Sequence, residues 1–299
     1  MILCYDIIMG NYNELISIVT ASYNYENYIK QTIESVMAQS YQNWELIIVD
    51  DGSRDNSLNV INEYCQKDSR IKLFTHENNE NKGLAQTIQY GIELSNGKYI
   101  AFLESDDTIT SDYLEKKAKI IEKYENIALI FNDINLFGYE EKIRGFEYYI
   151  NKRAEILNSK IYPTNILKEM DIFNLISTFS SVMVRKDILR NLSFNSPIKA
   201  SLDYYLWLQV VQKHDVYYID EKLTNWRMHK DSYSNELKKP SSRDYLELNL
   251  LKNKFILYRN PIKRMLKNIW VYLVYFRKSF FKWHPKERMV MFLGKTFNY

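Results

Sequence analysis

Short apolar runs alternate with amphipathic stretches along the first 131 residues. The apolar runs are rich in Ile, Leu and Val and predict buried strands at 15–20, 44–49, 71–74, 97–102 and 127–131. Between them, apolar residues recur at three- and four-residue spacing and predict helices near 29–37, 56–66, 84–92 and 111–124. Strand–helix alternation with short connections predicts an α/β fold, with a mostly parallel sheet and helices on both of its faces.

The pattern is less regular from residue 132 to residue 202. Residues 144–162 are expected to form a loop and a short helix over the site, and residues 179–184 to form a strand. A helix is then expected to begin at Asp203, because Leu206, Trp207 and Val210 follow at helical spacing. A further strand is predicted at 216–219.

Asp203 occupies an unusual place in this pattern. The spacing puts its carboxylate at the start of the helix and on the apolar face, so we expect it at the edge of a cleft and partly desolvated. The alternative is an ordinary acid in the first helical turn, which the helix dipole favours.

Polar residues follow three of the predicted strands at their carboxyl ends. They are Tyr23-Asn24, Asp50-Asp51 and Glu104-Ser105-Asp106-Asp107. Ligands of open α/β sheets bind at those ends, and a cluster of carboxylates suits a hard cation. Asp and Ser also cap helices, which is the alternative for each segment taken alone. Three polar ends on one edge of a sheet favour a binding site.

Composition narrows the class of protein. Of the 299 residues 46% are hydrophobic, while Gly and Pro number 8 and 5, so a folded chain with a substantial core is expected. Two cysteines, Cys4 and Cys65, are too few for a disulfide framework and indicate a reducing compartment. The stretch from Met1 to Met9 is short, contains Asp6 and lacks a basic start, so we do not expect it to be a secretory signal.

Charge divides the chain into an acidic body and a basic end. Residues 250–299 hold 12 of the 40 Lys and Arg residues but one of the 37 acids, Glu287. Aromatic and basic residues alternate there, and the uncharged run 268–276 is far shorter than the ~20 residues that span a bilayer. We expect a basic amphipathic helical region on the inner face of the cell membrane. The alternative is a helical appendage that packs on the acidic body or on a partner. No nucleic-acid-binding fold accompanies the charge.

Six motifs follow one another along the chain: Ile18-Val19-Thr20-Ala21-Ser22-Tyr23-Asn24, Val49-Asp50-Asp51-Gly52-Ser53, Asn81-Lys82-Gly83, Leu103-Glu104-Ser105-Asp106-Asp107, Leu202-Asp203 and Trp226-Arg227-Met228-His229. Taken together, they resemble the motifs of family 2 glycosyltransferases, inverting enzymes of the Rossmann-like GT-A fold. The resemblance covers residues 15–235, which divide into a nucleotide-sugar-binding half, 15–131, and an acceptor half, 132–235. Residues 1–14 are then a lead, and 236–299 the basic helical region.

The resemblance implies a role for each matching residue. Asp203 matches the catalytic base, and Asp106 the metal ligand. Glu104 would contact the metal or the ribose, and His229 the metal or the diphosphate. The nucleotide sugar would be bound by six residues: Thr20, Ala21, Tyr23, Asp51, Ser105 and Asp106. The implied cofactor is Mn²⁺ or Mg²⁺. The implied partners are a nucleotide sugar, above all a UDP-sugar, and a glycan or lipid-linked acceptor.

Three segments depart from the family pattern, at four positions. Glu104 stands where the first acid of an Asp-x-Asp is usual, Leu202 stands where an acid usually precedes the base, and Ile88-Gln89 replace Arg-Asn. The last change removes an expected contact to the diphosphate or base, so the nucleotide is not fixed by the motifs.

The chemistry of glycosyl transfer fits this set of residues. The departing nucleoside diphosphate gains charge that a divalent cation can absorb, and the acceptor hydroxyl needs one carboxylate base. Glycoside hydrolases use two carboxylates that flank the bond, and no second acid outside the strand-end cluster is compelling here. We therefore predict a metal-dependent inverting glycosyltransferase, with a role in bacterial surface polysaccharide synthesis. The alternative is a non-catalytic nucleotide-sugar-binding or scaffold subunit.

Overall fold

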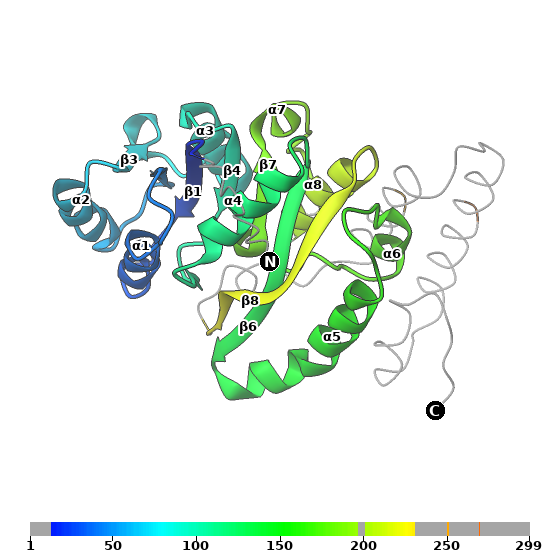
Figure 1. Cartoon of the computed structure of the whole chain (residues 1–299). Coiled ribbons are helices and arrows are strands. Elements are labelled where there is room, and N and C mark those ends of the chain that lie inside the picture. Colours follow the sequence, from blue (N-terminus) through cyan, green and yellow to red (C-terminus); the bar gives the residue numbers. More distant parts are fainter. Residues whose placement is uncertain (1–12, 197–200, 231–249, 251–268, 270–299) are drawn as a thin grey trace, which may run out of the picture.

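The structure is a computed structural model, and it describes residues 13–196 and 201–230, together with Leu250 and Ile269. Eight strands form one sheet (Figure 1). They are β1 (Ile16–Ser22), β2 (Trp44–Asp50), β3 (Ile71–Thr75), β4 (Tyr99–Phe102), β5 (Thr108–Ile109), β6 (Leu129–Gly138), β7 (Val182–Arg185) and β8 (Val216–Met228).

The sheet has the order β3-β2-β1-β4-β7-β6-β8-β5. Its first four strands are parallel, with Ile16 beside Trp44 and Ser22 beside Asp50 in the central pair. Strand β7 runs antiparallel to β4 and β6, β8 runs parallel to β6, and β5 closes the edge antiparallel to β8. The predicted mostly parallel α/β sheet is therefore confirmed, with antiparallel pairs in its second half.

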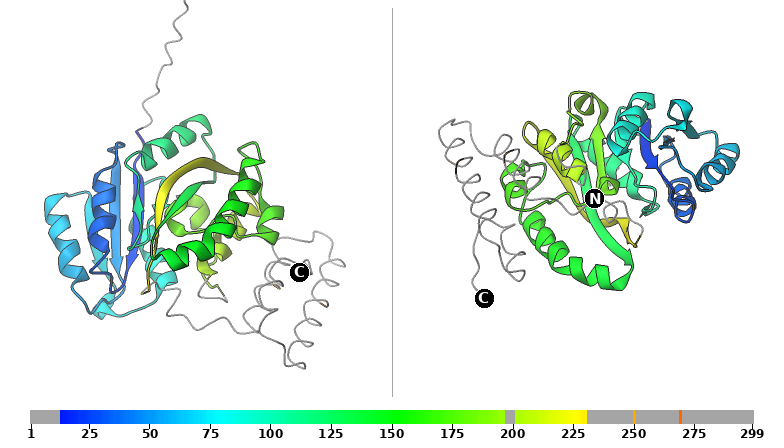
Figure 2. Two further views of the ribbon diagram at one scale, coloured as in Figure 1. Left: turned by 90° about the horizontal axis from the view of Figure 1, so that it is seen from below. Right: turned by 180° about the vertical axis from the view of Figure 1, so that it is seen from behind.

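Helices cover both faces of the sheet, which Figure 2 shows from two further directions. The described helices are α1 (Ile29–Met37), α2 (Ser57–Lys67), α3 (Leu84–Leu94), α4 (Tyr113–Lys123), α5 (Glu140–Asn158), α6 (Leu167–Ile172), α7 (Lys186–Leu189), α8 (Leu202–Val211) and the short 3₁₀ turns η1 (Glu77–Asn79) and η2 (Phe179–Ser181).

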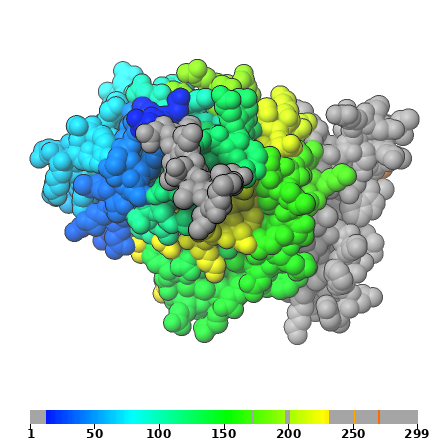
Figure 3. Space-filling model, in the orientation of Figure 1, coloured from blue at the N-terminus to red at the C-terminus, as the bar shows by residue number. Residues whose placement is uncertain are grey.

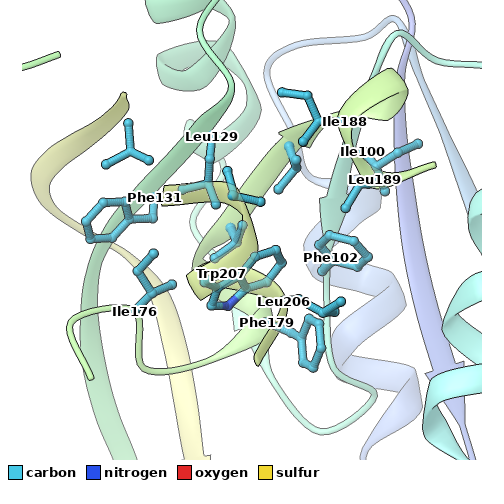
Figure 4. Packing of buried hydrophobic residues seen from close by; sticks show 14 of the residues in the cluster. Ile100, Phe102, Leu129, Phe131, Ile176, Phe179, Ile188, Leu189, Leu206 and Trp207 are labelled. Atoms are coloured by element: carbon cyan, nitrogen blue, oxygen red, sulfur yellow. The ribbon is translucent and has the colours of Figure 1, made fainter. Parts of the chain in front are cut away.

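Alternation along the strands decides which helix each side chain meets. Ile16 and Ile18 of β1 pack in the layer of α1, α2 and α4, whereas Val19 packs in the layer of α3 and α8. In the second layer Phe102, Phe179 and Trp207 pack with ring centroids 5.4–5.8 Å apart (Figure 4). This cluster fixes the start of α8, and with it Asp203, against the end of β4.

The first half of the chain follows the prediction closely, whereas residues 132–202 differ from it. Residues 140–158 form one 19-residue helix, α5, in place of a loop and a short helix. The segment 179–184 begins as the turn η2 and becomes a strand at Val182. Strands β6 and β8 are longer than expected, because they pair with each other along most of their length.

The predicted basic helical region, 236–299, lies outside the described residues apart from Leu250 and Ile269. Within the part of the chain that the structure describes, no helix is long and apolar enough to cross a membrane.

Candidate active site

The three polar strand ends come together at one edge of the sheet. Strands β1, β2 and β4 are parallel neighbours, so Tyr23, Asp51 and Glu104 follow their adjacent carboxyl ends. Hydrogen bonds join the first two ends: Asp51 N donates to Ser22 O (2.8 Å) and Asn24 N to Ser53 Oγ (2.9 Å). This edge of the sheet, the strand-end rim of Tyr23, Asp51 and Glu104, is therefore ordered. It lies where ligands of open α/β sheets bind.

Asp51 connects this rim to the start of α3. Its carboxylate accepts hydrogen bonds from the backbone N–H groups of Lys82 (2.7 Å) and Gly83 (3.0 Å), and His76 Nε2 lies 3.5 Å away. The following residue, Gly52, has φ +80°, and a Cβ there would lie 2.6 Å from the backbone oxygen of Asn79. The motif needs glycine at this place because of both the positive φ and the close approach.

The acidic stretch after β4 contains three carboxylates in different environments. Asp107 is fully buried, and its two oxygens accept from Ser180 Oγ (2.6 Å) and from the backbone N–H of Arg227 (2.8 Å). Glu104 and Asp106 are partly exposed. Asp107 thus anchors the stretch internally, while Glu104 and Asp106 remain available at the rim.

The turn η2 supplies hydroxyl groups to these acids. Thr178 donates a short hydrogen bond to the Glu104 carboxylate, and the backbone N–H of Glu104 donates to Ser180 Oγ (3.0 Å). The backbone of the turn is also fixed, because Nζ of the fully buried Lys117 donates a hydrogen bond to Ser181 O (2.8 Å). Sequence reasoning missed this role. The hydroxyl-rich run 177–181 was the signal that could have revealed it.

Asp203 faces the acidic stretch from the first turn of α8. Burial raises the pKa of its carboxyl group to about 7, against the hydrogen bonds that the backbone N–H groups of the helix start donate. Burial, together with the nearby carboxylates of Asp106 and Asp203, also raises the pKa of Glu104 to about 8. Two acids with raised pKa values therefore share one site, which is typical of functional sites.

Asp106 lies against the end of β8. Its Oδ2 is 2.8 Å from His229 Nε2, and its backbone oxygen accepts from Arg227 Nε (2.7 Å). The rings of Tyr28 and His229 lie 4.5 Å apart, which fixes the imidazole beside the carboxylate. The structure thus brings Asp106 and His229 into contact although 123 positions separate them in the sequence.

The described residues contain no group of three or more His, Cys, Asp or Glu side chains arranged to hold a metal ion. A carboxylate oxygen and an imidazole nitrogen are nevertheless ligands that Mn²⁺ accepts, and a diphosphate supplies further oxygens. The Asp106–His229 pair therefore fits a divalent cation in donor type, provided that the hydrogen bond between them is exchanged for metal contacts.

The other predicted nucleotide contacts differ in exposure. Ala21 and Tyr23 are partly exposed at the end of β1, whereas Thr20 is fully buried one residue earlier. Ser105 is 4% exposed, and its backbone oxygen accepts from Thr32 Oγ1 (3.0 Å). Their roles toward a nucleotide stay predictions.

The strand-end rim carries the carboxylate–imidazole pair of Asp106 and His229, and the partly exposed Asp203 lies at the start of α8. The fold that holds them is that of the GT-A glycosyltransferases, which is the class of this protein. The chain belongs to the glycosyl transferase family 2, whose model matches residues 17–192.

Known relatives agree in sequence and in fold. The chain is 32% identical over 202 residues to UDP-Glc:alpha-D-GlcNAc-diphosphoundecaprenol beta-1,3-glucosyltransferase WfgD of Escherichia coli, covering 68% of this chain and 72% of the relative. It is similar in fold to Staphylococcus aureus TarS 1-349 in complex with UDP-GlcNAc, with a TM-score of 0.63 and 18% identity over 88% of this chain and 73% of that one. Mannosyltransferase PcManGT of Pyrobaculum calidifontis, in complex with GDP-Man and Mn²⁺, matches with a TM-score of 0.57 and 12% identity over 89% and 72% of the two chains.

Proposed function

We propose that this glycosyltransferase moves a sugar from a UDP-sugar to a glycan or lipid-linked acceptor, with a divalent cation and with inversion at the anomeric carbon. The observation that carries the proposal is Asp203, a carboxyl group with a pKa raised to about 7 that faces the acidic stretch after β4. A group of this pKa is suited to accept a proton near neutral pH.

The donor would lie along the strand-end rim. Ala21 and Tyr23 would line the nucleotide pocket, and Asp51 would accept a hydrogen bond from the base while it holds the start of α3. Thr20 is fully buried, so its side chain would support the floor of the pocket. Ser105 and Asp106 would lie against the ribose and the diphosphate.

Asp106 and His229 would hold the cation, with Glu104 as a neighbouring acid. When bound, a divalent cation neutralises charge that develops on the departing diphosphate. Arg227 would keep Asp106 in place through the hydrogen bond to its backbone oxygen.

Asp203 would act on the acceptor. Its carboxylate takes the proton of the acceptor hydroxyl as that oxygen forms a bond to the anomeric carbon. The bond from this carbon to the phosphate oxygen breaks, and UDP departs with the electron pair. A single displacement of this kind inverts the configuration.

The names of similar proteins support this choice of substrates. The E. coli relative is named for a UDP-glucose donor and a diphosphoundecaprenol-linked acceptor, and the S. aureus structure contains UDP-GlcNAc. The P. calidifontis structure contains Mn²⁺. We infer a role in surface polysaccharide or lipid-linked glycan synthesis on the same basis.

A thermal-shift screen of UDP- and GDP-sugars with and without Mn²⁺ tests the donor. We expect a UDP-sugar to raise the Tm by about 3 °C or more when Mn²⁺ is present. The same addition should have a much smaller effect on Asp106→Asn. A shift with GDP-sugars alone would contradict the UDP assignment, and no shift with any donor would contradict the function.

A non-catalytic binding subunit is the second candidate, and Glu104 favours it. Its pKa, raised to about 8, leaves this acid mostly protonated at neutral pH, so it is a weaker ligand for a cation than an ionised aspartate. Donor binding without UDP release on any acceptor would support this candidate.

The basic region 250–299 would hold the enzyme on the inner face of the membrane, close to a lipid-linked acceptor. Flotation with anionic liposomes tests this attachment. We expect the full chain to float, and flotation of a chain cut after residue 250 would contradict the assignment.

A further inference from the structure

Four aromatic rings form a continuous series, the aromatic ladder, on the side of the sheet that α5 covers. It consists of Trp226, Phe146, Tyr149 and Phe173. Phe146 contacts Trp226 edge-on with centroids 5.5 Å apart and Tyr149 edge-on at 6.2 Å. Tyr149 is stacked on Phe173 at 4.9 Å with the planes 13° apart.

The inner end of the ladder, formed by Tyr149 and Phe173, meets the active site. There, Tyr149 Oη contacts Ser177 Oγ (3.0 Å), and the next residue, Thr178, donates to Glu104. Burial raises the pKa of Tyr149, and the nearby carboxylate of Asp203 raises it further, so the phenol and the proposed base are electrostatic neighbours. At the outer end, Trp226 directly precedes the segment of β8 that contacts Asp106.

The ladder differs from the aromatic cluster of the core in its exposure. Phe102, Phe179 and Trp207 are at most 5% exposed, as expected for rings that only fill space. Phe146 is 37% exposed, and Trp226, Tyr149 and Phe173 are all partly exposed. Figure 3 shows the surface of β8 (yellow) beside that of α5 (green), the two elements that carry the outer rings. The ladder therefore presents ring surface outside the core.

We propose that the aromatic ladder binds the pyranose ring of the acceptor that carries the reacting hydroxyl, or the ring next to it. This rests on the proposed transfer reaction, since it places the acceptor beside Asp203, whose carboxylate acts on Tyr149 electrostatically. The faces of aromatic rings carry negative charge and attract the C–H groups of a sugar ring, while a few polar groups fix its orientation. Ser177 is such a polar group at the inner end.

The position of the ladder favours a sugar over a lipid tail as the occupant. The group beside Asp203 must carry the hydroxyl that loses its proton, and a hydrocarbon chain has none. The inner end of the ladder is also polar, with Ser177, Thr178 and Glu104 in sequence along the hydrogen-bonded path.

Saturation-transfer NMR on the full chain tests the proposal with simple probes. The octyl β-glycosides of glucose, galactose, mannose and N-acetylglucosamine are mixed with the protein in the presence of UDP and Mg²⁺, which is diamagnetic and leaves the proton signals sharp. We expect transfer to the ring protons of at least one glycoside. The affinity of Phe146→Ala for that glycoside should be about five- to tenfold lower than that of the wild type, which is the loss expected for one ring contact.

Two further variants control for folding. Phe146→Tyr keeps the ring and should bind like the wild type. Tyr148→Ala removes a ring that is 72% exposed two positions further along α5, and it should also leave binding unchanged. Circular dichroism and Tm verify that Phe146→Ala is folded.

The NMR signals of the sugar ring, the octyl chain and UDP distinguish the possible outcomes. Equal ring signals in wild type and Phe146→Ala would overturn the proposal, as would ring signals from none of the four glycosides in the wild type. Signals confined to the octyl chain would assign the ladder to lipid and also overturn it. UDP signals report on the donor site independently, so their loss would count against the proposed function and not against the ladder alone.

Discussion

The pKa of the Asp203 carboxyl group is raised because desolvation at the start of α8 disfavours its charged form. A general base works only when it is deprotonated. We therefore predict that kcat/KM rises with pH, is half-maximal near pH 7, and falls as this group becomes protonated below that value. A pH–rate profile at saturating Mn²⁺ measures it. A flat profile between pH 5.5 and 8.5 would contradict the role of Asp203.

The same raised pKa has a consequence for stability. The folded chain keeps the Asp203 proton between about pH 4 and 7, where the unfolded chain has lost it, so the free energy of unfolding falls as pH rises through this window. Asp203→Asn removes the titration. We predict that this variant has a higher Tm than the wild type at pH 8, by a few degrees, and that the difference disappears as pH falls toward 4. A lower Tm at pH 8 would show that Asp203 is stabilising.

Among the elements, η2 has a positioning role that its length of three residues does not suggest. Ser180 Oγ joins the backbone of Glu104 to the carboxylate of Asp107, so it fixes both ends of the acidic stretch. We predict that Ser180→Ala raises the Mn²⁺ concentration needed for half-maximal activity about tenfold, because removing two buried hydrogen bonds loosens that stretch.

Ser181→Ala is the matched control for this prediction. The Ser181 hydroxyl is equally buried but donates within the turn, to Thr178 O (3.0 Å), and has no hydrogen bond to the acids among the described residues. It should lose stability without a change in metal activation. Equal metal activation in the two variants would show that η2 is only structural.

Helix α5 is attached to the sheet by a buried ion pair. Arg153 is fully buried, and its guanidinium binds Asp133 Oδ1 (2.6 Å), Leu175 O (2.7 Å) and Asn132 O (3.1 Å). We predict that Arg153→Ala lowers the free energy of unfolding by about 3–5 kcal/mol, because it leaves a buried carboxylate unpaired. Lys152→Ala, which breaks the exposed pair with Glu155, should change it by less than about 1 kcal/mol. Urea unfolding measures both, and equal losses would contradict the account.

Some of these elements were predictable from the sequence and others were not. The strands and helices up to residue 131 could be predicted from local periodicity. Asp203 could be predicted as a candidate site residue from its place at the start of an apolar helical face. Helix α5 was missed because its inward side chains include the polar Arg153, whose partners come from distant segments. The internal role of Asp107 was not predicted, because its partners Ser180 and Arg227 come from distant segments that no local pattern reveals.

At the scale of the whole molecule, one sheet brings the two halves of the chain to a common site. The first half contributes the rim after β1, β2 and β4, and the second contributes η2, α8 and the end of β8. The antiparallel strand β7 makes this possible, because it leads directly out of η2 and pairs with β4. The acidic stretch after β4, from the first half, and Asp203, from the second half, therefore lie in one site.

The central claim is that Asp203 accepts the proton while the rim and Asp106 hold the donor. The most direct test measures the rate of UDP release from UDP-sugars with an acceptor, together with UDP affinity by calorimetry, for wild type and Asp203→Asn. We predict that the variant releases UDP at least about 100-fold more slowly, while its Kd for UDP in the presence of Mn²⁺ changes less than about twofold. An unchanged rate of release in Asp203→Asn would contradict the account.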